Sequence, residues 1–316
     1  MKKVTSTTRR KVLGLLGSTA LAACSAPQIV SRDANDPFEG GIGGTGIVGL
    51  LTDFGSLIVN GLRVEVENDT KVVSAYGVVS QDVLAPGMAL TVYATRNRDA
   101  IIARQVSVDY ALVGTAQRDG VNFSVNGVSV FLEPGALGRF DNGARVALNG
   151  AWAKEGFVAS RVDPAPDARD LIAGTVNHSG AGGFDIGGAQ IAFSGPRPGA
   201  GEYGVAIGRG NRSRFEAQSL KTGRFNGVPS LTQLSVEGFL EPVAARPGFR
   251  VAGLGHSFAP NVMLAPLAQS RAIYFGPYNG RFRARAGYLM PQDLVARRGL
   301  LKNGFADGFD GQIVKT

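Results

Sequence analysis

The residues best suited to covalent chemistry surround Ser257. Residues 255–259 read Gly-His-Ser-Phe-Ala and approach the G-x-S-x-G turn that exposes a nucleophilic serine in α/β-hydrolases. In that fold a histidine must follow the serine, but the chain's two histidines, His178 and His256, both precede it. No alternation of strand and helix patterns surrounds the motif. We therefore favour the interpretation that residues 255–259 form a strand end followed by a turn. An envelope serine hydrolase that uses Ser257 is kept as an alternative hypothesis.

Cofactor and metal motifs are weak in this chain. Residues 41–46 spell G-x-G-x-x-G, but a dinucleotide site needs that pattern between a strand and a helix, and here it precedes a hairpin pattern. A zinc site needs three or four nitrogen or sulfur ligands, whereas the chain has two histidines and one cysteine. We therefore predict no cofactor, no metal site and no catalytic residues.

The charge distribution points to a binding surface in the C-terminal part. Residues 200–316 carry 15 basic and 7 acidic side chains, whereas residues 24–199 carry 13 basic and 18 acidic ones. In an extended segment, arginines at every second position share one face. The candidate anion-binding residues are Arg281, Arg283, Arg285, Arg297 and Arg298. A solvated surface without a ligand is the alternative, because runs of charge usually remain solvated.

The N-terminus resembles a bacterial export signal. Arg9 and Arg10 form a twin-arginine pattern, and the apolar stretch 12–23 is too short for the about 20 residues that a transmembrane helix needs. The tetrapeptide 21–24 reads Leu-Ala-Ala-Cys and resembles a lipobox, which implies cleavage before Cys24 and lipidation of its sulfur. The membrane would thus be a partner through the lipid on Cys24.

These signals predict a cell-envelope location. Ser25 differs from the aspartate that retains lipoproteins in the inner membrane, so the resemblance implies an outer-membrane lipoprotein facing the periplasm or the surface. Such a place favours an anionic glycan, lipopolysaccharide or another envelope protein as partner, and makes nucleic acid an unlikely one. Cys24 is the only cysteine, so an internal disulfide is impossible.

A hairpin signal recurs along the rest of the chain. Asn60-Gly61 and Asn126-Gly127 each lie between alternating apolar residues, which is the pattern of a type I′ hairpin. Gly187-Gly188 takes the same place in a third copy. A spacing near 60 residues indicates one supersecondary unit that is used several times.

Each unit contains about five short strands joined by glycine turns, as in a small OB-like barrel. The last strands of the first three units are expected at 103–108, 159–162 and 232–236. We therefore predict an all-β chain of tandem, antiparallel, five-stranded OB-like modules with an N-terminal signal helix and a disordered linker. The expected parts are a signal peptide 1–23, a Gly/Pro linker 24–45, modules 46–110, 111–168 and 169–237, and a degenerate basic module 238–316. The one helix expected in the mature chain spans residues 260–272.

Residues 43–49 and 54–61 resemble the repeated bacterial domain of unknown function 5666 family. The similarity is best over residues 43–110 and weakens beyond about residue 170. The resemblance implies an envelope protein of tandem β-barrel repeats and brings no established catalytic residues. We predict a non-enzymatic, lipid-anchored protein that binds or scaffolds an anionic envelope polymer or a protein partner. A passive structural spacer is the remaining alternative.

Overall fold

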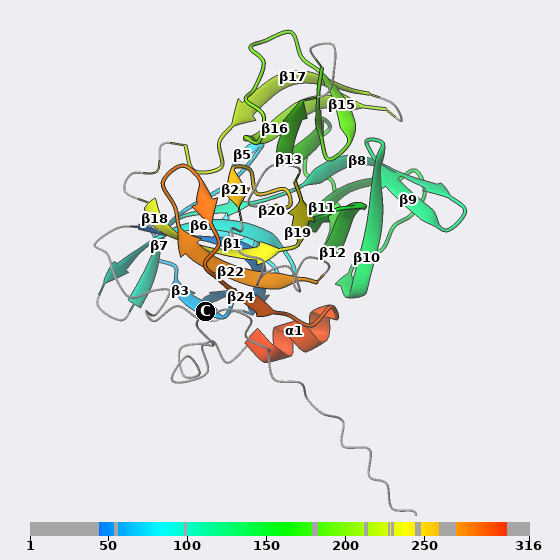
Figure 1. The fold of residues 1–316 in the computed structure, drawn as a ribbon. Coiled ribbons are helices and arrows are strands. Elements are labelled where there is room, and N and C mark those ends of the chain that lie inside the picture. The colour runs from blue at the N-terminus through cyan, green and yellow to red at the C-terminus, as the bar shows by residue number, and fades with distance from the viewer. Residues whose placement is uncertain are drawn as a thin grey trace, which may run out of the picture.

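The computed structural model describes most of the chain between residues 44 and 301. The described ranges are 44–53, 56–97, 100–178, 183–211, 214–226, 228, 231–243, 248–258 and 270–301. Arg9, Arg10, Cys24 and the predicted linker up to residue 43 lie outside them. The predicted fold class is confirmed, because the described part is built of β-strands with OB-like barrels in tandem and one short α-helix (Figure 1).

Barrel 1 is a closed ring of five strands. Its first strand pairs with the second and the fourth, the fourth pairs with the fifth, and the third runs parallel to the fifth. These strands are β1 (Gly44–Asp53), β2 (Leu57–Val59), β3 (Leu62–Glu65), β6 (Ala89–Asn97) and β7 (Ala100–Val108). Between β3 and β6 the chain forms β4 (Lys71–Ser74), β5 (Gly77–Val78) and the 3-10 helix η1 (Gln81–Val83).

The same cycle of pairings occurs twice more. Barrel 2 consists of β8 (Leu112–Asp119), β9 (Asn122–Val125), β10 (Val128–Leu137), β11 (Arg145–Ala153) and β12 (Gly156–Pro164). Barrel 3 consists of β13 (Asp170–His178), β14 (Phe184–Ile186), β15 (Ala189–Ala192), β16 (Tyr203–Gly210) and β17 (Phe215–Thr222). Strands β8 and β13 also pair, which joins the two rings into one ten-stranded sheet.

The repeated Asn-Gly turns have the expected geometry. Asn60 and Gly61 have φ angles of 55° and 74°, and Asn126 and Gly127 have 53° and 78°. Positive φ at both central residues is what a type I′ turn requires. Both asparagine side chains fold inward and donate to a carbonyl of the first strand of their own barrel, Val48 O at 3.1 Å and Val113 O at 3.0 Å. The turn asparagine therefore fastens the hairpin to its own barrel.

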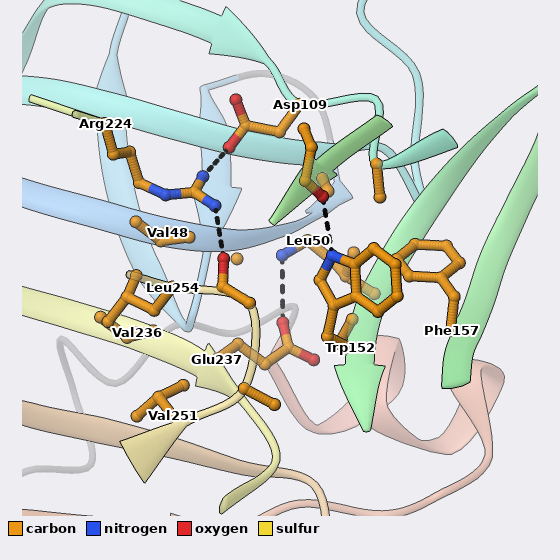
Figure 2. A pocket seen from close by; sticks show the side chains of 18 of the residues that line it. Val48, Leu50, Asp109, Trp152, Phe157, Arg224, Val236, Glu237, Val251 and Leu254 are labelled. Carbon is orange, nitrogen blue, oxygen red and sulfur yellow. Dashed lines mark hydrogen bonds and ion pairs between the residues drawn. The ribbon is translucent and has the colours of Figure 1, made fainter. Parts of the chain in front are cut away.

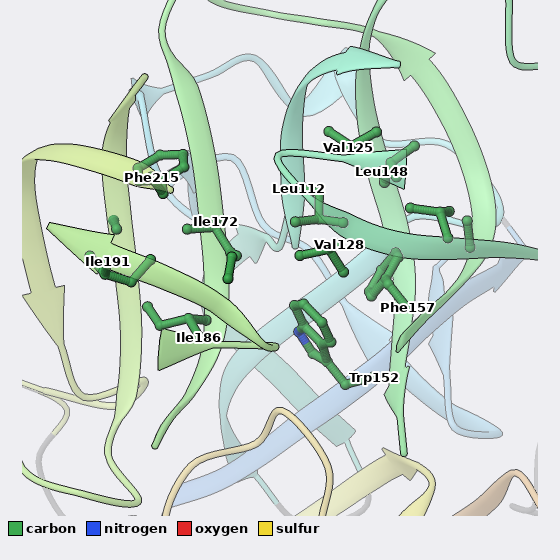
Figure 3. Close-up of a cluster of buried hydrophobic side chains, with 14 of the residues drawn as sticks. Leu112, Val125, Val128, Leu148, Trp152, Phe157, Ile172, Ile186, Ile191 and Phe215 are labelled. Atoms are coloured by element: carbon green, nitrogen blue, oxygen red, sulfur yellow. The ribbon is translucent and has the colours of Figure 1, made fainter. Parts of the chain in front are cut away.

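Barrel 3 lacks this asparagine, and Trp152 of barrel 2 takes its place. The turn residues are Gly187 and Gly188, with φ angles of 60° and 86°. The Trp152 indole Nε1 donates at 2.9 Å to the carbonyl of Ala173, which precedes Gly174 as Val48 precedes Gly49. Trp152 lies within the apolar core that barrels 2 and 3 share (Figure 3).

The prediction that residues 232–236 complete the third module is wrong. Strand β17 already closes that ring, and β18 (Leu231–Gly238) pairs parallel with the N-terminal half of β1 in barrel 1. Strand β1 pairs with β6 over residues 45–50 and with β18 over residues 44–48, and its C-terminal end pairs with β2. The chain thus returns from barrel 3 to barrel 1.

The C-terminal part extends barrel 1, and its described residues after 238 form no five-stranded ring. β22 (Ala272–Pro277) pairs with β18, and β24 (Ala286–Leu289) pairs with β22. The remaining elements are β19 (Leu240–Pro242), β20 (Phe249–Val251), β21 (Ser257–Phe258), β23 (Phe282–Arg283) and α1 (Leu294–Leu301). Most of the helix predicted at 260–272 lies outside the described residues, and Ala272 begins β22.

Candidate functional site

The arginine row, Arg281, Arg283 and Arg285, lies on one exposed face as the alternation predicts. All three side chains are exposed, whereas Phe282 and Ala284 between them are 0% and 1% exposed. In an extended chain, alternate residues are about 6.6 Å apart on the same side. The segment therefore presents three guanidinium groups at a regular spacing.

Neighbouring strands hold the arginine row in place. The backbone N–H of Phe282 donates to His256 O at 2.9 Å, and that of Arg285 donates to Phe275 O at 2.8 Å. Gly276 of β22 lies directly beneath, because a Cβ added there would be 1.8 Å from Arg283 O. The backbone of the row is thus anchored from two sides while its side chains point outward.

Arg297 does not belong to the exposed surface, and we withdraw it from the candidate anion-binding set. Its side chain is 0% exposed and its Nη2 binds both carboxylate oxygens of Glu133, at 2.8 and 2.9 Å. The helix α1, unrecognised in the sequence, turns this residue inward. Arg298 is half-buried on the same helix, and its Nε donates to Thr52 O at 3.0 Å.

Arg297 is part of a buried cluster of four charges, which we call the ion-pair cluster. Arg271 bridges Glu133 at 2.9 Å and Glu237 at 3.1 Å, and Arg297 also reaches Glu237 at 3.0 Å. Burial raises the pKa of a carboxyl, but at Glu237 the two arginines outweigh it and hold the pKa below its ordinary value. The cluster is charge-balanced, so it joins β10, β18 and α1 without calling for an outside ligand.

A third, largely buried arginine lies between barrels 1 and 3. Arg224 forms an ion pair with Asp109 (Figure 2). It also donates to Thr91 Oγ1 at 2.8 Å and lies 3.9 Å above the ring of Tyr203. Burial is the largest influence on Asp109 and raises its pKa, and Arg224 opposes it. The adjoining cavity measures about 50 Å³, room for a few water molecules. We assign this arrangement to the packing of barrels 1 and 3.

The hydrolase motif does not form a catalytic pair. The Ser257 hydroxyl accepts from Val251 N at 3.0 Å and donates to Val251 O at 3.4 Å. Burial, followed by the charge of Arg281, lowers the pKa of His256, whose ring lies near Gly201 of barrel 3. The serine hydroxyl is thus bonded to the backbone of Val251, and no hydrogen bond joins it to the His256 imidazole. Ser257 therefore serves to close the strand end.

A polar cleft of about 450 Å³ is a further concave feature of the described part. It opens between barrel 2, barrel 3 and the β19–β20 hairpin, with Trp152 at its wall. The sequence did not indicate this cleft, because its lining comes from six separate segments. Only the turn glycines of the hairpin repeat indicated any part of it.

The described residues contain no group of three or more His, Cys, Asp or Glu side chains that could hold a metal ion. No helix among them is sufficiently long and apolar to cross a membrane.

Comparison with protein-family models, with curated proteins and with solved structures finds no match. The resemblance to the domain of unknown function 5666 family therefore stays a prediction.

Proposed function

We propose that the protein is a non-enzymatic binding or scaffolding protein of the cell envelope, whose arginine row holds an anionic polymer. The observation that carries this proposal is the alternation of exposed arginines with buried residues over 281–285. Hydrogen bonds to charged groups contribute about 1.5–3 kcal/mol each, so three spaced guanidinium groups suit a chain of repeated anions. Phosphate-bearing lipopolysaccharide or an anionic glycan has that chemistry.

The excess of basic side chains over residues 200–316 supports a cationic surface, although several of these arginines lie in internal ion pairs. Arg224, Arg250, Arg271 and Arg297 are engaged with carboxylates and do not contribute to an outer face. The arginine row remains exposed, with Arg281 close enough to influence His256. Arg298 lies on α1, where its Nε donates to Thr52 O, and is kept as a separate, half-buried candidate.

The proposed location is the outer membrane, facing the periplasm or the surface, with lipid on Cys24 as the anchor. The support is the pattern of Arg9 and Arg10 followed by a lipobox-like tetrapeptide that ends in Cys24. Two or three acyl chains would make a firm anchor, since each buried CH₂ contributes about 0.8 kcal/mol. Fractionation of cells that express Cys24→Ser tests this part: we expect the variant to leave the membrane fraction, and its retention there would contradict lipid anchoring.

The test of the binding function compares two triple variants of the full chain. Arg281→Ser/Arg283→Ser/Arg285→Ser removes the row, and Arg63→Ser/Arg139→Ser/Arg214→Ser removes three exposed arginines elsewhere. We expect lipopolysaccharide to bind the parent and the control at low salt, and to bind the row variant at least tenfold more weakly. Binding should also fall in about 1 M salt, where the Debye length is about 3 Å.

Two outcomes would contradict this function. Equal binding by both triple variants would mean that the row is not the site. If the parent binds neither lipopolysaccharide nor anionic glycans, a passive spacer becomes the better description.

A further inference from the structure

We propose that the polar cleft between barrels 2 and 3 is a second binding site, and that its ligand is an uncharged oligosaccharide. The cleft's volume of about 450 Å³ lies within the range of about 300–1,000 Å³ that small-molecule sites occupy. It is separate from the arginine row, and none of the row's residues lines it. Binding at the cleft can therefore be tested independently of binding at the arginine row.

The walls of the cleft come from corresponding turns of two barrels. Barrel 2 contributes its second hairpin at Gly127 and the β11–β12 turn at residues 153–156, and barrel 3 contributes the hairpin turn at Gly187 and Gly188. In OB-like barrels, the loop between the fourth and fifth strands is a common contributor to oligosaccharide and oligonucleotide sites. Glycine at such turns lets a ligand approach the backbone, and a Cβ added at Gly188 would meet open space.

One wall carries an ordered chain of polar groups. Arg250 Nε donates to Glu241 Oε1 at 2.5 Å, and its Nη2 donates to Asn177 Oδ1 at 2.8 Å. Asn177 Nδ2 in turn donates to Asp185 Oδ1 at 3.2 Å, and the N–H of Gly188 donates to the same oxygen at 3.1 Å. These bonds fix the orientation of the side chains in advance. Carboxylate oxygens have further lone pairs, so the wall still offers acceptors to hydroxyl groups.

The β11–β12 turn also contributes Lys154 and Glu155 to the lining, and both are exposed. Together the cleft holds two basic and three acidic side chains, which makes it weakly negative. That balance disfavours a polyanion. Alternating donors and acceptors, with few apolar side chains besides Trp152, suit a ligand that is rich in hydroxyl groups and carries no charge.

The experiment measures binding of neutral tetrasaccharides to the full-length chain by calorimetry. The probes are maltotetraose, cellotetraose, mannotetraose and the tetramer of N-acetylglucosamine. The cleft variant is Lys154→Ser/Glu155→Ser, whose changes fall on exposed turn residues. The matched control is Lys71→Ser/Glu65→Ser, two exposed residues of barrel 1 outside the cleft. A third protein, Arg281→Ser/Arg283→Ser/Arg285→Ser, separates this site from the arginine row.

We expect at least one tetrasaccharide to bind the parent, the control and the row variant alike, with little dependence on salt. The cleft variant should bind it at least tenfold more weakly, and Glu241→Gln should weaken it as well. The proposal is overturned if no probe binds the parent, or if the cleft variant binds as the control does. It is equally overturned if binding is lost in the row variant, because the sugar would then occupy the arginine row.

Discussion

Three backbone carbonyls, those of Val48, Val113 and Ala173, hold the same place before a glycine in the first strand of each barrel. A turn asparagine satisfies the first two, and the Trp152 indole satisfies the third. The following glycines leave room for these side chains: a Cβ at Gly49 would lie 1.8 Å from Asn60 Oδ1. At the residue scale, Trp152 of barrel 2 thus supplies the hydrogen-bond donor that the hairpin turn of barrel 3 lacks.

This substitution predicts a compensating pair of changes. Trp152→Ala should cost about 3–5 kcal/mol of unfolding free energy, because it opens a cavity and leaves a carbonyl unpaired. Gly187→Asn alone should also destabilise, since its Cβ would lie 2.0 Å from Trp152 Cη2. In the double variant the asparagine can adopt the φ near 60° that Asn60 and Asn126 already have. We expect the double variant to be clearly more stable than the sum of the single losses.

Denaturant unfolding of the four proteins measures this coupling. The control is Gly188→Asn, which lies one residue farther along the turn and has nothing within 4 Å of its added Cβ. It should not rescue Trp152→Ala. Additive losses for Trp152→Ala and Gly187→Asn would show that the two positions are not equivalent.

The ionisation of Tyr203 should make the free energy of unfolding depend on pH in the alkaline range. Burial raises its pKa from 10.0 to about 12, with Asp109 acting in the same direction and Arg224 opposing. A raised pKa in the folded state means that stability is present below pH 10 and is lost as the pH rises toward 12. In Tyr203→Phe we expect a smaller loss of stability across this interval, measured by denaturant unfolding at several pH values. An unchanged pH profile would mean that the phenol is not buried as described.

At the element scale, the backbone position of the arginine row depends on Gly276 of β22, which has no side chain. Gly276→Ala would place a Cβ 1.8 Å from Arg283 O, and overpacking of this kind costs about 1–3 kcal/mol. We therefore expect lower stability together with weaker binding of lipopolysaccharide. The control is Gly299→Ala in α1, where nothing lies within 4 Å and alanine should stabilise the helix by about 0.5–1 kcal/mol. Thermal unfolding of both variants checks whether the two stability changes have opposite signs. An unchanged stability of Gly276→Ala would contradict the close approach of Gly276 to Arg283 O.

The elements also show which features a sequence can predict. The Asn-Gly hairpins and the outward face of Arg281, Arg283 and Arg285 depend on local turn chemistry and on strand alternation, and both could be predicted. The burial of Arg297 could not be predicted from the sequence, because its partner Glu133 lies 164 residues away. The path of β18 was missed for the same kind of reason: its pairing with β1 joins distant parts of the chain.

At the scale of the whole molecule, the ion-pair cluster connects barrel 2 through Glu133, β18 through Glu237, and the C-terminal part through Arg271 and Arg297. The side chains of its four members are at most 3% exposed. Removing one member of a buried ion pair costs about 3–5 kcal/mol, mainly because the remaining charge is left uncompensated. The loss of unfolding free energy in each variant should therefore depend more on the charge balance left in the cluster than on the number of hydrogen bonds removed.

Replacing Arg297 by Met leaves two carboxylates facing Arg271 alone, and we expect a loss of about 3–5 kcal/mol. Adding Glu133→Leu restores one acid to one base, so the double variant should be more stable than either single variant. Arg298→Met is the matched control on the same helix, since that residue is half-buried and makes one hydrogen bond to Thr52 O. It should cost less than Arg297→Met. Denaturant unfolding ranks the four proteins, and limited proteolysis reports whether α1 detaches first. If Arg297→Met/Glu133→Leu loses as much as the two single changes together, charge balance does not govern the cluster, and packing of α1 against β10 must supply its stability instead.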